Sequence, residues 1–184
     1  MILKDYFPDK SWSLFLDRDG VINERIIDGY VLSWDEFRFL PGVKEALTLL
    51  SSVFGHIFIV TNQQGIGKGL MSEKDLEAIH EKMLQDISDA GGNITKVYYS
   101  PFLSAENHIS RKPNPGMAIM ARREYPVIDL TKSFMVGDSK SDMEFGRNAG
   151  MVNVFIGKKE EIEDETQAYC YSSLEEFANQ LTAR

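Results

Sequence analysis

Acidic side chains that directly follow short apolar runs are the residues of this chain best suited to chemistry. Asp17 and Asp19 come just after the apolar run Trp12 to Leu16. Residues two apart on extended chain point the same way, so we expect Asp17 and Asp19 to lie together and Arg18 to point elsewhere. Such close carboxylates repel each other unless a cation lies between them. With Asp138, which follows a later apolar run, they would supply the oxygen-rich site that Mg²⁺ prefers.

A bound metal would give the two leading aspartates different roles. One carboxylate can be a nucleophile that is held ionised, while its neighbour donates a proton to a leaving oxygen and later recovers it. Thr61 and Asn62 follow another apolar run, and the basic pair Arg111-Lys112 lies in a later loop. Ligands of open parallel sheets bind at the carboxyl ends of the strands. These distant segments can therefore converge on one cleft for an anionic substrate.

Several of these residues also have ordinary structural interpretations. Asp17 and Asp19 could be turn and cap residues, although this interpretation weakens because other polar groups share the same strand-end layer. Thr61 and Asn62 could satisfy loop amides. Asp142 could coordinate metal, hold the lysine of the basic pair, or cap the helix that follows.

Two further features do not indicate a ligand site. The stretch Gly65 to Gly69 lacks the spacing and the Lys-Ser/Thr ending of a phosphate-binding P-loop, so we expect a mobile glycine turn. His56, His80 and His108 are scattered along the chain, and we assign none of them as a metal ligand.

Short apolar runs alternate with segments of helical periodicity, which is typical of an α/β domain on a parallel sheet. One helix should begin at Ser72, with Asp75 completing a variant of the capping box, and another at Ser173 with Glu176. The predicted strands are Trp12 to Leu16, His56 to Thr61, Ile94 to Tyr99, Ser133 to Val136 and Val152 to Ile156. The remaining helices should cover Gly42 to Ser52, follow Pro115, and run from Ser141 to Ala149.

Composition limits the class of protein. The 184 residues are 43% hydrophobic and 26% charged, which fits one globular domain over residues 1–184. The net charge of −8 argues against binding to a nucleic-acid backbone or an anionic membrane surface. The lone Cys170 excludes an internal disulfide. No apolar segment approaches the length of a membrane span, so we expect a protein of the cytoplasm. We also expect a monomer.

The chain resembles the haloacid dehalogenase superfamily of phosphatases in the order and type of four motifs. They are Asp17-Arg18-Asp19-Gly20-Val21, Thr61-Asn62, Lys112, and Gly137-Asp138 with Asp142. From Leu14 to Gly157 the similarity is to the heptose bisphosphate 7-phosphatases and the related histidinol-phosphatases. More specific matches are FLDRDGVIN at 15–23, DGYV at 28–31, FLPGV at 39–43, VTNQQGIGKG at 60–69 and RKPNPGM at 111–117.

The resemblance implies a fold and an activity. The fold would be a Rossmann-like three-layer α/β sandwich with a mainly parallel central sheet and a minimal cap. The activity would be Mg²⁺-dependent hydrolysis of a small phosphorylated sugar, foremost the 7-phosphate of D-glycero-D-manno-heptose 1,7-bisphosphate, for lipopolysaccharide or another heptose-containing glycan. Histidinol phosphate or another small sugar phosphate is the alternative. A non-catalytic binding module is a further possibility, but it has no need for a crowded acidic set.

The resemblance also implies roles for individual residues. Asp17 would attack phosphorus and form an aspartyl phosphate, with Asp19 as the acid and then the base. The carboxylates of Asp17 and Asp138, with the main-chain carbonyl of Asp19, would bind Mg²⁺. The phosphoryl group would be bound by Thr61, Asn62 and Lys112, and the rest of the substrate by Arg25, Asp28, Gln63 and Arg111.

The chain departs from this pattern at two positions. Many relatives carry a zinc loop with three cysteines and a histidine, but Tyr99 to Ser110 contains no cysteine and only His108, so we expect no structural zinc. Relatives often have lysine directly after the aspartate of the fourth motif, whereas this chain has Ser139 and then Lys140. Whether either residue contacts metal or substrate is left open by the sequence.

Overall fold

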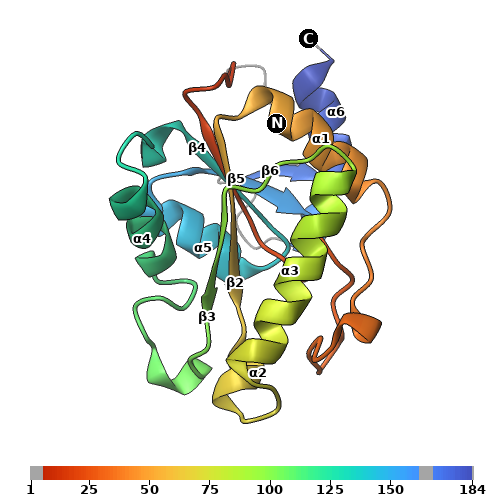
Figure 1. Ribbon diagram of the computed structural model, residues 1–184. Helices are drawn as coiled ribbons and strands as arrows, with labels where there is room; N and C mark the ends of the chain where they lie inside the picture. The colour runs from red at the N-terminus through yellow and green to blue at the C-terminus, as the bar shows by residue number, and fades with distance from the viewer. Residues whose placement is uncertain (1–5, 162–167, 184) are drawn as a thin grey trace.

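A computed structural model, which describes residues 6–161 and 168–183, has a six-stranded parallel sheet at its centre (Figure 1). The strand order is β3-β2-β1-β4-β5-β6, and each neighbouring pair is parallel. The strands are β1 (Ser13–Leu16), β2 (His56–Asn62), β3 (Lys96–Ser100), β4 (Ser133–Gly137), β5 (Val152–Ile156) and β6 (Ala168–Tyr171). β1 therefore lies between β2 and β4, and these three strands end in the acidic and polar motifs.

Helices cover both faces of the sheet. Figure 1 shows α3, α1 and α6 on one side and α4 and α5 on the other. The α-helices are α1 (Val43–Val53), α2 (Gln64–Gly67), α3 (Glu73–Asp89), α4 (Gly116–Glu124), α5 (Lys140–Ala149) and α6 (Leu174–Thr182). Short 3-10 turns occur at η1 (Trp34–Glu36), η2 (Ser104–Glu106), η3 (Leu130–Lys132) and η4 (Lys159–Glu161). This confirms the predicted three-layer α/β architecture.

Alternation along β1 explains the two cores. Leu14 and Leu16 pack in the larger core with residues of α1, α3 and α6, whereas Phe15 packs in the second core with residues of α4 and α5. All three side chains are fully buried. A strand that is apolar on both faces is what a central strand of a parallel sheet requires. Among the described helices, none has the length and apolar character needed to cross a membrane.

The five predicted strands are all present, but the sequence interpretation missed β6. This strand has only four residues, Ala168–Tyr171, and it pairs with β5 at the edge of the sheet. Its short mixture of alanine, tyrosine and cysteine has no clear apolar alternation, so its pairing with β5 defines it. The predicted helix starts are confirmed: Ser72 and Asp75 form a capping box, and the Ser173 side chain accepts a hydrogen bond from the Glu176 backbone.

Of the glycine turn expected over Gly65 to Gly69, the first part forms the short helix α2, and Lys68 and Gly69 form a turn after it. Gly67 lies in α2 and donates its backbone hydrogen bond to the carbonyl of Pro101 at 3.1 Å. A Cβ on Gly67 would lie 2.6 Å from that carbonyl oxygen, so the close approach of the two segments requires glycine. α2 is thereby fixed against the loop after β3 at the carboxyl end of the sheet.

Candidate active site

The nucleophile predicted from the sequence, Asp17, extends β1 at its carboxyl end. Its backbone N–H donates to the carbonyl of Val136 at 2.9 Å, which continues the pairing with β4. Lys112 Nζ lies 2.7 Å from Asp17 Oδ1 and 2.6 Å from Asp142 Oδ1. Lys112 is 3% exposed and Asp142 is fully buried. One buried ammonium therefore holds two carboxylates that the sequence separates widely.

Asp142 has two of the three roles that the sequence left open. Besides holding Lys112, it caps α5, because its Oδ2 accepts from the Ser139 backbone at 3.1 Å and from the Ser139 hydroxyl at 2.5 Å. It is also close enough to take part in a metal site. One oxygen each of Asp17, Asp138 and Asp142 lies within 4.8 Å of the others.

The acidic cluster fits a divalent cation. Among the described residues, Asp138 Oδ1 is buried and has no hydrogen-bond partner. Burial, together with the charge of Asp142, raises the pKa of Asp17 to about 8 and that of Asp138 to about 6 in the metal-free protein. A hard cation would relieve this crowding with the oxygen ligands that suit Mg²⁺. Gly20 lets the backbone approach, since its φ is +99° and a Cβ there would lie 2.0 Å from Asp138 Oδ2.

The predicted acid and base, Asp19, is held by three side chains. Arg18 Nη2 donates to both of its carboxylate oxygens at 3.0 Å. Asn23 Nδ2 and Gln63 Nε2 each donate to one oxygen at 2.9 Å. Burial acts to raise the pKa of Asp19, but the charge of Arg18 and these hydrogen bonds outweigh it and lower the pKa. The expectation that Arg18 points away from the carboxylates was therefore wrong, because its guanidinium turns back to Asp19.

The polar residues at the end of β2 position their neighbours. Asn62 Nδ2 donates to the carbonyl of Lys112 at 3.1 Å, and the Lys112 N–H donates to Asn62 Oδ1 at 3.0 Å. This two-way contact fixes the backbone of Lys112, as the loop-amide interpretation of Asn62 predicted. The buried hydroxyl of Thr61 accepts from Gln63 Nε2 at 2.9 Å. Binding of a phosphoryl group by Thr61 and Asn62 stays a prediction.

A pocket of about 190 Å³ opens over these residues. Its lining includes Arg25, Gln63 and Arg111, which the sequence placed with the substrate. Arg25 reaches the acidic cluster, where its Nη1 donates to Asp138 Oδ2 at 3.2 Å. Asp28 is exposed in a left-handed turn (φ 55°), and the structure does not bring it to the pocket lining. Ser139 and Lys140 follow Asp138 in the sequence. Ser139 lines the pocket, whereas Lys140 is not among the described residues that line it.

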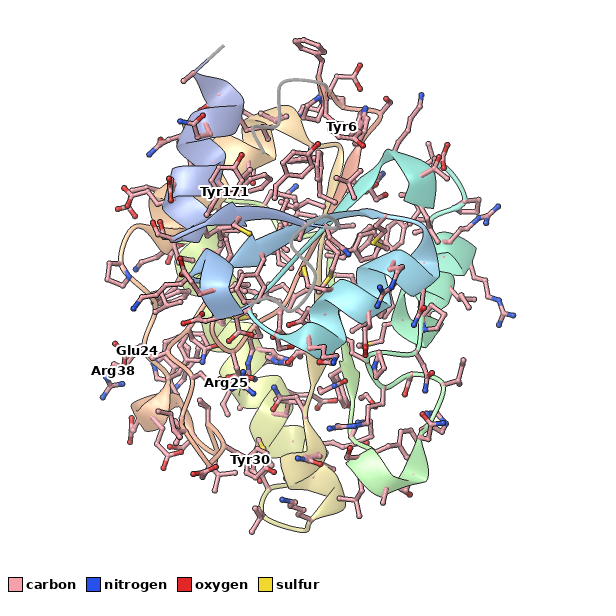
Figure 2. All side chains as sticks on the ribbon, turned by 180° about the vertical axis from the view of Figure 1, so that it is seen from behind. Tyr6, Glu24, Arg25, Tyr30, Arg38 and Tyr171 are labelled. Atoms are coloured by element: carbon pink, nitrogen blue, oxygen red, sulfur yellow. The ribbon has the colours of Figure 1, made fainter. Side chains whose placement is uncertain are left out.

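Tyr30 is a pocket residue that the site prediction did not assign. Its hydroxyl accepts from Gln64 Nε2 and from Lys68 Nζ, each at 2.8 Å. Figure 2 shows Tyr30 beside α2 and Arg25 nearer the sheet. The DGYV match in the sequence was the available signal, but only the fold shows that α2 and the residue after it, Lys68, deliver two donors to this hydroxyl.

Hydrogen bonds and stacking hold the loop that leads to the basic pair. His108 stacks on Phe102 with ring centroids 3.5 Å apart, and its Nδ1 lies 2.8 Å from the Ser110 hydroxyl. Arg111 Nη1 donates to the carbonyl of Phe102 at 3.1 Å. These contacts join the two ends of the segment in which the sequence predicts no structural zinc.

We therefore predict opposite responses to removal of zinc and of magnesium. A zinc-selective chelator should leave the melting temperature unchanged, because protein contacts hold the loop. Removing Mg²⁺ should stop turnover, and adding it should raise the melting temperature, because we expect the ion to bind the acidic cluster in the folded state only. Metal analysis and thermal melts would check this. Purified protein with one tetrahedral zinc per chain would contradict the expectation.

The comparisons with known proteins agree with this geometry. A family model described as HAD-hydrolase-like matches residues 109–177, which include Lys112, Asp138 and Asp142. The D-glycero-alpha-D-manno-heptose-1,7-bisphosphate 7-phosphatase of Mycobacterium bovis is 40% identical over 137 residues, which cover 74% of this chain and 72% of that protein. The chain belongs to the HAD-like hydrolase family.

This HAD-like hydrolase also resembles proteins named for the other anomer. The D-glycero-beta-D-manno-heptose-1,7-bisphosphate 7-phosphatase of Rhodopseudomonas palustris is 39% identical over 146 residues, which cover 74% of this chain and 78% of that protein. Among solved structures, the D,D-heptose 1,7-bisphosphate phosphatase from B. bronchiseptica, complexed with magnesium and phosphate, has a TM-score of 0.85 and 30% identity. The match covers 94% of this chain and 98% of that one.

Proposed function

We propose that this HAD-like hydrolase is a Mg²⁺-dependent phosphatase that removes the 7-phosphate of D-glycero-D-manno-heptose 1,7-bisphosphate. The observation that carries the proposal is the contact of Lys112 with Asp17 and Asp142, 2.7 and 2.6 Å long, beside the unpaired Asp138 oxygen. The relatives from Mycobacterium bovis and Rhodopseudomonas palustris, at 40% and 39% identity, carry the heptose name. They therefore favour the heptose bisphosphate over histidinol phosphate.

In the proposed mechanism, Asp17 is the nucleophile. Its carboxylate attacks phosphorus and the bond to the leaving oxygen breaks. Asp19 must first take up a proton, because its pKa is lowered in the free protein, and it then passes that proton to the leaving oxygen. Water then attacks the phosphorus of the aspartyl phosphate and gives its proton to Asp19, which releases inorganic phosphate and the free Asp17 carboxylate. Lys112 would balance the charge of the transferred oxygens, which is the main requirement of phosphoryl transfer.

Magnesium would be held by the carboxylates of Asp17 and Asp138 and by the main-chain carbonyl of Asp19. When bound, the ion supplies positive charge to the phosphoryl oxygens and keeps the nucleophile ionised. Asp142 is a weaker candidate ligand, because its two oxygens already contact Lys112 and Ser139. Arg25 occupies one oxygen of Asp138 in the metal-free protein, so it must adjust if both oxygens of Asp138 are to turn to the metal.

The far end of the pocket suits the second phosphate of a bisphosphate. Burial lowers the pKa of Arg111, and Tyr30 raises it. Among the described residues, no carboxylate forms a salt bridge with this guanidinium. The hydroxyl of Tyr30 accepts two hydrogen bonds from Gln64 and Lys68, which leaves its own proton available to a ligand. A distal phosphate would meet both donors. Cytoplasmic location and a monomeric state stay predictions.

Steady-state kinetics on four substrates test the proposal. Both anomers of the heptose bisphosphate, histidinol phosphate and p-nitrophenyl phosphate should be compared at one Mg²⁺ concentration. We expect kcat/KM to be largest for a heptose bisphosphate. Arg111→Ala should raise KM about tenfold for the bisphosphate and change KM for p-nitrophenyl phosphate much less, because the aryl ester has no distal phosphate.

The matched control for this variant is Arg123→Ala, an exposed arginine on α4, which should leave both substrates unaffected. A larger kcat/KM for histidinol phosphate than for either heptose bisphosphate would overturn the substrate assignment. Equal losses on the bisphosphate and the aryl ester in Arg111→Ala would show that Arg111 does not recognise the distal group.

A further inference from the structure

A buried arginine and histidine lie behind Asp19 and are not used by the mechanism above. Arg18 is fully buried, and His80 on α3 is 7% exposed. Arg18 Nη1 lies 3.1 Å from His80 Nε2, and its Nη2 contacts both oxygens of Asp19. Within the described residues, Arg18 Nε has no partner. Among the described side chains, His80 and Asp19 are the two that hold its guanidinium.

The chemistry of the contact fixes the form of the histidine. A guanidinium has donors and no acceptor, so His80 Nε2 must accept and the ring proton must lie on Nδ1. Burial, and then the charge of Arg18, lowers the pKa of His80 to about 3, so its ring is neutral at physiological pH. A neutral ring in this tautomer suits a fixed acceptor for Arg18. With Nε2 as the acceptor, the neutral ring of His80 is neither a proton donor nor a charged partner for Arg18.

Arg18 is also the distinctive partner of Asp19. Asn23 and Gln63 each bind one oxygen of the carboxylate, whereas Arg18 contacts both. The Asp19 side chain is 26% exposed, so it faces the pocket from one side while the guanidinium supports it from behind. A planar guanidinium whose Nη1 is anchored on His80 and whose Nη2 contacts both carboxylate oxygens can fix the direction of Asp19 more firmly than a single amide donor.

We propose that Arg18 and His80 are a positioning pair for proton transfer. His80 holds the guanidinium of Arg18, and Arg18 holds the carboxylate of Asp19 in the direction from which it exchanges a proton with the leaving oxygen. The proposal rests on the acid and base role of Asp19 in the proposed function, but not on the heptose substrate. α3 is thereby connected to the chemistry, although only His80 of this helix takes part in the contact.

The test separates positioning from a structural role by the leaving group. A nitrophenolate leaves readily without a proton, whereas an unsubstituted phenolate depends more on the general acid. His80→Phe keeps a ring of similar size but removes the acceptor. In this variant we expect kcat/KM to fall about tenfold for phenyl phosphate and less than about threefold for p-nitrophenyl phosphate. Across a series of substituted phenyl phosphates, log kcat/KM should therefore depend more steeply on the pKa of the leaving phenol than in the wild type.

Three further variants make the outcome decisive. His80→Gln offers an amide oxygen to Arg18 and should restore the wild-type dependence. Ile79→Val, a buried change on the same helix, should lower stability without changing that dependence. If His80→Phe does not fold, Arg18→Lys keeps the buried charge without the planar fork and should show the same steeper dependence.

Parallel losses for all esters in the folded variants, or a steep dependence that His80→Gln leaves uncorrected, would overturn the proposal. Because the series contains only aryl phosphates, its result does not depend on the heptose assignment. If the enzyme does not hydrolyse the heptose bisphosphates but the aryl phosphates give the expected results, only the proposed substrate is contradicted.

Discussion

Asp17→Asn should lower kcat by about 10⁴-fold or more on every substrate while the protein stays folded. The amide is nearly isosteric with the carboxylate, so its oxygen can still accept a hydrogen bond from Lys112. In the wild-type protein Lys112 Nζ lies 2.7 Å from Asp17 Oδ1. However, an amide is a far poorer nucleophile and a weaker ligand for Mg²⁺. The variant should therefore lose the chemical step and most of the metal-induced rise in melting temperature.

We also expect a specific effect of Asp17→Asn on the stability of the metal-free protein. Burial and the neighbouring carboxylates raise the pKa of Asp17, so the fold holds this charge at a cost when no metal is bound. Asp17→Asn removes the charge and leaves Lys112 paired with Asp142. The melting temperature without Mg²⁺ should not fall, although the enzyme is inactive.

Two measurements check these expectations. Single-turnover reactions with labelled substrate, quenched in acid, should trap phosphoprotein in the wild type and none in Asp17→Asn. Asp35→Asn, the same chemical change at an exposed position in η1, is the control and should behave as wild type. Retained activity in Asp17→Asn would contradict a covalent mechanism through this residue.

The sequence predicted the central part of the site because parallel strands bring their carboxyl ends together. Asp17 after β1, Thr61 near the end of β2 and Asp138 after β4 were therefore placed correctly at one edge from apolar runs and their ends. Lys112 was assigned to the site because it matches a known motif, and not because of any periodicity in the sequence. Its contact with Asp17 and Asp142 depends on the path of the loop after β3.

What the sequence missed depends on contacts between distant segments. Arg18 alternates away from Asp17 along the strand, but its long side chain returns to Asp19, and strand periodicity describes only the direction of Cβ. His80 was assigned no role because nothing in α3 indicates that this position faces Arg18. The two donors to Tyr30 come from Gln64 in α2 and from Lys68 directly after it, and the glycine-rich composition of this segment gave no indication of a helix.

Lys112→Met should abolish turnover and also destabilise the protein, and these two effects can be separated. Lys112 is the cation between Asp17 and Asp142, and both carboxylates are buried. Removing one partner of a buried ion pair leaves uncompensated charge, which costs about 3–5 kcal/mol of unfolding free energy. Loss of its charge at the transferred phosphoryl group should lower kcat by about 10³-fold or more on bisphosphate and aryl ester alike.

A double-mutant cycle distinguishes the structural role of Lys112 from its catalytic role. Asp142→Asn removes the second charge but keeps an oxygen that can accept from the Ser139 backbone, so the cap of α5 should survive. Combined with Lys112→Met, it should recover part of the lost unfolding free energy, because the loss of one carboxylate offsets the loss of the ammonium and the cluster regains its wild-type net charge. Activity should stay lost, since the charge of Lys112 at the phosphoryl group is still missing. Denaturant melts and kinetics of the four proteins measure both quantities. Recovery of activity together with stability would mean that Lys112 acts only by holding the carboxylates, and that the phosphoryl charge is balanced elsewhere in the pocket.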